Sequence, residues 1–203
     1  MPQIFVPLST ALEIMGSVLG VKADTTLKSR VRAITDMGVP RAGRDKAHQR
    51  LRYGLTELSE MTLVLLLTDA GIAPSTAARL VREGWADFAP AAFEACRPLM
   101  PPGYSGTGAR SDGPIAVVGG ARLREAGKQG TRREREVGEL PHVDTSTPEV
   151  RLGEALGAAA IAVVVNAPAF MPTLVNALVV HAVVPQDLVD SFIALRDSED
   201  DGR

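Results

Sequence analysis

The chain has 203 residues, of which 45% are hydrophobic and 23% charged, a composition typical of a globular protein with a hydrophobic core. The single cysteine excludes an internal disulfide bond, and with it any argument for a disulfide-stabilised secreted fold. The N-terminal apolar run has no basic residues before it and does not resemble a signal peptide, which favours a cytoplasmic location.

The formal net charge of −2 is unevenly distributed along the chain. Residues 21–54 hold nine basic and three acidic residues, a local charge of +6, so the rest of the chain carries about −8. A basic block within an acidic protein suits the binding of phosphate groups, whereas the simpler interpretation is a solvated surface. Charge alone leaves both interpretations open.

Apolar residues at helical spacing predict a first helix over residues 10–20 and a second over residues 26–37. One face of the second helix is apolar, and its other face carries Lys28, Arg30 and Arg32. A glycine and a proline follow this helix and predict its end, because glycine suits a helix C-cap and proline cannot continue a helix.

The polar, basic segment that follows predicts a short hairpin with residues 49–53 as its second strand. Two more helices are predicted over residues 56–71 and 73–83, the first of them strongly apolar.

The second half of the chain begins after residues 98–114, which have the composition of a linker. Strands are predicted near residues 114–123 and 160–167, the latter a run rich in β-branched side chains. Two helices are expected to close the chain, over residues 172–183 and 185–196.

Three strings in the first half match a known pattern. SRVRAITDMGVP has a small polar residue, an arginine after an aliphatic residue, and a glycine six residues later, at Ser29, Arg32 and Gly38. QRLRYGLTEL places Tyr53 four residues before Glu57, and GIAPSTAARLV follows the next helix. In these strings the chain resembles the DNA-binding domain of the MerR family and the related excisionase-type winged helices.

The resemblance covers roughly residues 10–85 and has departures. The paired tyrosines usual after the helix arginine are replaced by Ala33 and Ile34, and no long dimerisation helix follows the domain. The fold it implies is α+β, with a winged helix-turn-helix DNA-binding domain over residues 1–95. A linker over residues 96–114 and a small α/β module for dimerisation or regulation over residues 115–203 complete this prediction.

The predicted function is sequence-specific binding of double-stranded DNA by a nucleoid-associated transcription regulator, a homodimer with RNA polymerase as a further expected partner. An arginine on the exposed face of a helix in the major groove can reach base edges, whereas basic hairpin residues set position and affinity. The residues expected to contact DNA are Lys28, Ser29, Arg30, Arg32, Arg41, Arg44, Lys46, Gln49, Arg50 and Arg52.

Two alternatives stay open: a phage or recombination accessory protein that binds DNA in the same way, and a protein-interaction adaptor whose basic face binds an acidic partner. We expect no enzyme activity, cofactor or metal site. The three histidines are scattered, and the sequence around Gly127 and Lys128 lacks the spacing of a phosphate-binding loop.

Residues 155–186 contain no formally charged residue and are long enough to span a bilayer. Prolines and asparagines interrupt the stretch, which favours a buried helix end and strand over a membrane span. Because the stretch is more apolar than a small module needs, we expect it to form the homodimer interface, with Leu178 or Val179 facing outward.

Overall fold

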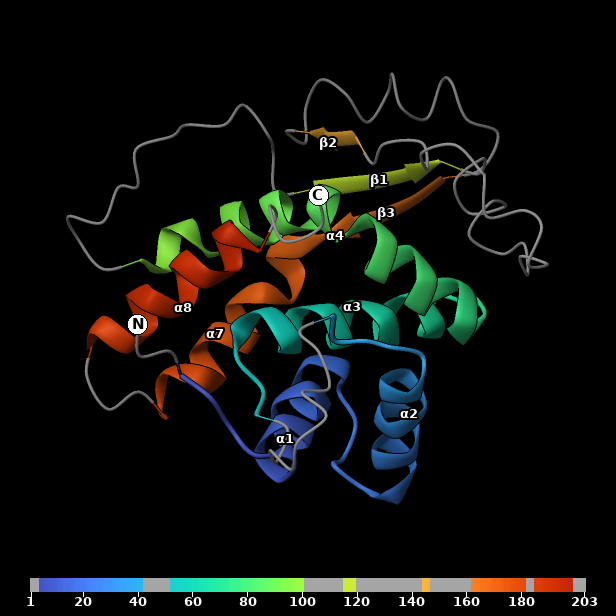
Figure 1. Ribbon diagram of the computed structural model, residues 1–203, viewed down its shortest axis with the longest axis horizontal. Helices are drawn as coiled ribbons and strands as arrows, with labels where there is room; N and C mark the ends of the chain where they lie inside the picture. The colour runs from blue at the N-terminus through green and yellow to red at the C-terminus, as the bar shows by residue number, and fades with distance from the viewer. Residues whose placement is uncertain are drawn as a thin grey trace.

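The computed structural model describes residues 4–41, 52–100, 115–119, 144–146, 162–181 and 185–198, and helices dominate this part of the chain (Figure 1). The helices are α1 (Leu8–Leu19), α2 (Thr25–Asp36), α3 (Leu55–Asp69), α4 (Pro74–Cys96), α7 (Met171–Val179) and α8 (Pro185–Asp197), with two short 3₁₀ turns, η1 (Arg97–Leu99) and η2 (Ala167–Ala169). The strands are β1 (Ile115–Gly119), β2 (Asp144–Ser146) and β3 (Ala162–Asn166).

The turn between α1 and α2 is fixed by local backbone chemistry. Gly20 ends α1 in the left-handed conformation, with φ of 67°, which glycine adopts without steric cost. The Asp24 carboxylate then caps α2 by accepting a hydrogen bond of 2.9 Å from the Leu27 backbone N–H. The two helices, which apolar spacing predicted, agree with the structure to within two residues at each end.

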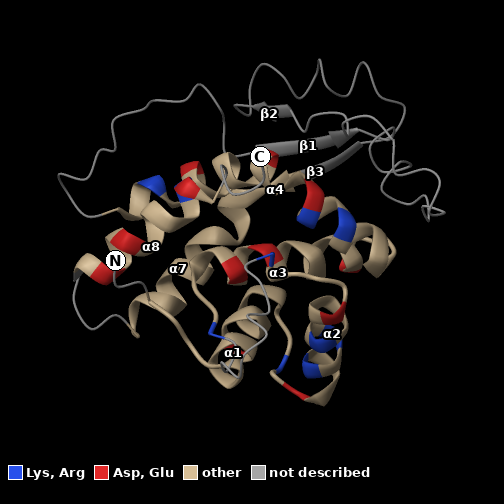
Figure 2. Cartoon of the chain, viewed as in Figure 1, with Lys and Arg blue, Asp and Glu red and all other residues tan. Residues whose placement is uncertain are grey.

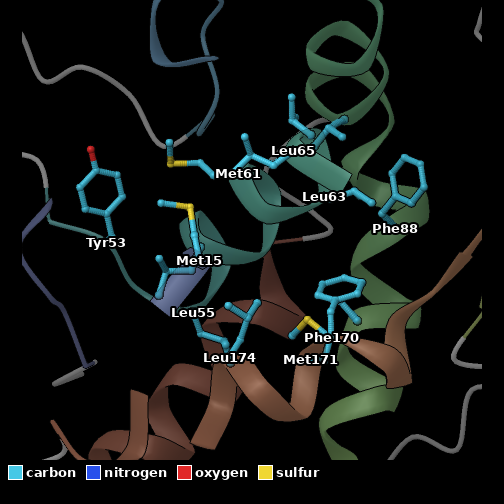
Figure 3. Close-up of a cluster of buried hydrophobic side chains, with 14 of the residues drawn as sticks. Met15, Tyr53, Leu55, Met61, Leu63, Leu65, Phe88, Phe170, Met171 and Leu174 are labelled. Carbon is cyan, nitrogen blue, oxygen red and sulfur yellow. The ribbon is translucent and has the colours of Figure 1, made fainter. Parts of the chain in front are cut away.

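Helix α3 lies at the centre of the molecule and contacts α1, α2, α4, α7 and α8 (Figure 1). Most of its side chains are buried, on every side of the helix, as expected for a helix whose apolar residues do not keep to one face. Figure 3 shows Met61, Leu63 and Leu65 of α3 pointing in different directions, toward separate neighbours.

Helix α4 continues to Cys96, well beyond the end near residue 83 that the sequence predicted. The extension passes through Gly84 and Pro90, residues that disfavour a helix interior. Its buried side chains include Trp85 and Phe88, each at most 2% exposed. Burial of this apolar face against the core outweighs the local preference of the glycine and the proline.

The three strands form a small antiparallel sheet in the order β2-β1-β3, which lies against α4 (Figure 1). Ile115 pairs with Ser146 of β2 and with Asn166 of β3. The β-branched residues of β3 favour the extended backbone, so this strand and β1 lie where the sequence predicted strands.

The predicted fold class, an α+β winged helix-turn-helix with a small α/β module, is wrong, because helices dominate the described residues. Tyr53, expected to end the return strand of a hairpin, pairs instead with Val6: the backbone N–H of each donates to the carbonyl oxygen of the other at 3.0 Å. No hairpin lies beside α2 in the described part of the chain, and residues 42–51 lie outside it.

Elements from the two halves of the sequence share one hydrophobic core. Helix α7 packs on α1, α3 and α4, and α8 packs on α3 and α4. The N-terminal segment joins them, because the Ile4 backbone N–H donates a hydrogen bond of 3.1 Å to Ser191 Oγ of α8. Leu178 is buried in this core and Val179 is 41% exposed, so most of the apolar surface of α7 is used within the chain.

A buried polar network holds the chain after α2 against α3 and α8. Glu60 of α3 is 1% exposed and accepts hydrogen bonds from the Arg41 backbone N–H at 2.7 Å and from Arg41 Nε at 3.0 Å. The Arg41 guanidinium also donates to the Ser198 carbonyl oxygen at 3.0 Å and lies 5.8 Å from the centre of the Trp85 ring. Trp85 Nε1 in turn donates to Ser198 Oγ at 2.9 Å.

Burial raises the pKa of Glu60, and the hydrogen bonds and charge of Arg41 offset only part of that effect. The carboxylate therefore depends on Arg41 as its partner, since an ionised group without one is costly to bury.

Arg41→Ala should lower the free energy of unfolding by about 3–5 kcal/mol, because it leaves the Glu60 carboxylate buried without its counter-charge. The matched control is Arg79→Ala, which opens an exposed pair with Glu83 one turn along α4 and should cost less than about 1 kcal/mol. Urea unfolding measures both values, and equal losses in the two variants would refute the importance of the buried pair.

Phe192→Ala removes a fully buried ring from α8 and should destabilise the whole molecule by about 3–5 kcal/mol. Because the core is shared, far-ultraviolet circular dichroism and the fluorescence of Trp85 should report one coincident unfolding transition at a lower urea concentration. If α8 belonged to a separate unit, the variant would instead show two transitions, with that of the N-terminal helices unchanged.

Candidate nucleic-acid interface

Helix α2 presents a polar face to solvent and an apolar face to the core. Leu27, Val31 and Ile34 are each at most 3% exposed and lie on its inner face. Lys28 and Arg32, one turn apart, are exposed, and Ser29 lies beside them. Neither basic side chain forms an ion pair with any residue in the described part of the chain. Both cations therefore face water.

The close approach of the turn to α1 requires a small residue at position 16. A Cβ atom placed on Gly16 would lie 2.8 Å from the Val21 carbonyl oxygen, closer than such contacts allow. The glycine thus lets the turn fold back on the end of α1. Helices α1 and α2 are consecutive and in contact, and residues 20–24 connect them.

Arg30 has a different role from its neighbours on α2. It is half-buried, and its guanidinium forms an ion pair with Asp69 at the end of α3. This contact joins α2 to the central helix. Arg30, predicted from the sequence to reach DNA bases, is therefore engaged within the protein.

Arg41 is also engaged within the protein, in the buried network with Glu60 described above. Only 17% of its side chain is exposed, so it presents little positive charge to a ligand. Sequence alone did not predict either arginine's partner, because each partner is distant in sequence: Asp69 lies 39 residues and Glu60 19 residues away.

Of the other predicted contact residues, Arg52 is exposed just before Tyr53, on the strand-like segment that pairs with Val6. The remaining four lie outside the described residues, and the structure says nothing of them: Arg44, Lys46, Gln49 and Arg50. The described part of the predicted site is thus Lys28, Ser29 and Arg32 on α2, with Arg52 on a separate segment.

Two exposed residues near this face were not predicted as contacts. Lys22 lies in the turn before α2, and Thr25 opens the helix. Their position directly around the N-cap could have identified them, because side chains at a helix N-terminus project beside its free backbone N–H groups. Acidic residues also lie at both ends of α2, which confines the positive charge to the middle of the face (Figure 2).

Neither a metal centre nor a reactive thiol competes with this face in the described residues. No group of three metal-binding side chains occurs there, and burial raises the pKa of the Cys96 thiol to about 12, which disfavours a nucleophilic thiolate. None of the described helices combines the length and apolarity needed to cross a bilayer. The uncharged stretch 155–186 is divided, in its described part, among β3, η2, α7 and the first residues of α8.

Comparisons with known proteins do not place the chain in a family. No family model matches it, and neither does any curated protein or solved structure.

Proposed function

We propose that the protein binds double-stranded DNA by placing the exposed face of α2 in the major groove. The observation that carries this proposal is the pair of exposed cations, Lys28 and Arg32, on a helix whose opposite face is fixed to the core. A major groove admits one α-helix, and arginine is the side chain that most often reads guanine there.

The spacing of the two exposed cations fits a base contact by Arg32 with a backbone phosphate contact by Lys28 close beside it. Lys28 and Arg32 are four residues apart, which corresponds to about 6 Å along the helix axis. Consecutive base pairs are about 3.4 Å apart, so the two side chains would reach positions within roughly two base-pair steps.

The fixed position of α2 supports this role. A helix that contacts bases binds more tightly when it is already held in place, because ordering it on binding would cost free energy. Leu27, Val31 and Ile34 attach α2 to the core, and the Arg30–Asp69 pair joins it to α3. Arg30 thus helps to hold in place the helix that carries Arg32.

One helix makes few base contacts, so a sequence-specific DNA-binding protein needs further contacts with the duplex. We extend the proposal, from the sequence, to the basic residues between 42 and 51 as backbone contacts and to a homodimer that reads two half-sites. In that form the protein would regulate transcription.

Arg32→Ala should weaken binding to a selected DNA site by about 1–3 kcal/mol and relax the preference for the base it reads. Fluorescence anisotropy with a duplex selected from a random pool measures the affinity. The matched control, Arg97→Ala, removes an equal charge from η1 and should leave affinity unchanged. If the two variants bind equally well, or if neither wild type nor variants select a duplex, α2 does not read DNA.

Lys28→Ala should weaken binding to all duplexes about equally, because we expect this lysine to contact a phosphate and not a base. The slope of log affinity against log salt concentration should then fall by about one unit. An unchanged slope would contradict a phosphate contact. If the wild type binds polyglutamate as tightly as it binds DNA duplexes, the adaptor function is favoured instead.

A further inference from the structure

An open pocket of about 360 Å³ lies between the end of α1, the second half of α3 and the junction of β3 with η2. Its walls include Val18 of α1, Leu66 and Ala70 of α3, and Ala169 and Phe170 beside η2. The volume falls at the low end of the range for small-molecule sites in proteins.

We infer that this pocket binds a small, uncharged and mostly apolar organic molecule that carries one hydrogen-bonding group. The lining side chains that the structure describes include none with a charge, which excludes selection for an ionic ligand. Asn166 is their one amide, and it is exposed at the mouth. An amide both donates and accepts, so it would orient a single polar group of the ligand.

The floor of the pocket is already formed. Leu63 and Phe170 line it and also line a small inner void of about 10 Å³ beside Trp85 and Phe88. Figure 3 shows Leu63, Phe88 and Phe170 at the junction of α3, α4 and the turn before α7. Since both residues are at most 6% exposed, the floor belongs to the packed core and needs no ordering when a ligand binds.

The surroundings favour a small molecule over a protein partner. A protein interface needs an apolar surface that extends beyond a single concavity. Within the described part of the chain, the exposed large hydrophobic residues are Phe5, Val21, Val179 and Val180, and none of them lines the pocket. The lining residues Ala70 and Ala169 are exposed and small, so they add little apolar surface around the pocket.

The test is a titration of the full-length protein with N-phenyl-naphthylamine, an uncharged apolar dye whose fluorescence rises when it leaves water. Saturable binding at one site is expected. Ala70→Phe and Ala169→Phe each place a ring into the pocket from a different wall, and each should weaken binding about tenfold or abolish it.

Ala73→Phe is the control, because Ala73 is exposed near the start of α4 and does not line the pocket. It should bind the dye as the wild type does. Thermal unfolding establishes which variants fold. Either of the two filled variants, Ala70→Phe or Ala169→Phe, is sufficient for the test. Unsaturable dye binding, wild-type binding by the filled variants, or equal loss in all three variants would overturn the inference. This result does not depend on whether the protein binds DNA.

Discussion

The burial of α3 on all its sides constrains the rest of the fold. A helix of fifteen residues with apolar side chains around its whole circumference cannot be covered by one neighbour, because one neighbour covers one face. Helices α1 and α2 precede it in sequence, α4 follows it, and α7 and α8 come from the far end of the chain. All five helices contact α3. Coverage of α3 therefore joins segments that are more than one hundred residues apart.

The same helix determines which basic residues face solvent. Glu60 on α3 forms an ion pair with Arg41, and Asp69 at the end of α3 forms one with Arg30. Arg30 joins α2 itself to α3 and Arg41 fixes the chain after α2, so the exposed face of α2 is left with Lys28 and Arg32. A local charge of +6 in the sequence thus divides between cations that hold the fold together and cations that a polyanion can reach.

Local signals predicted what is local in this molecule. Apolar spacing predicted α1 and α2, which the structure shows to be bounded by Gly20 and the Asp24 cap, and a strongly apolar run predicted the central helix. Long-range packing decided the rest. Helix α4 continues through Pro90 because Trp85 and Phe88 are buried beyond the predicted end, and the predicted winged fold was wrong. The partners of Arg30 and Arg41 followed from tertiary contacts that no spacing in the sequence indicates.

Native-state hydrogen exchange tests most directly whether one core, centred on α3, unites the two halves of the chain. A shared core predicts that the slowest amides of α3, α4 and α7 exchange with the same free energy, equal to that of global unfolding. It also predicts that added urea lowers these values in parallel. The shared core would be contradicted if α7 and α8 exchanged through an opening reaction whose free energy is several kcal/mol lower, while α3 and α4 stayed protected.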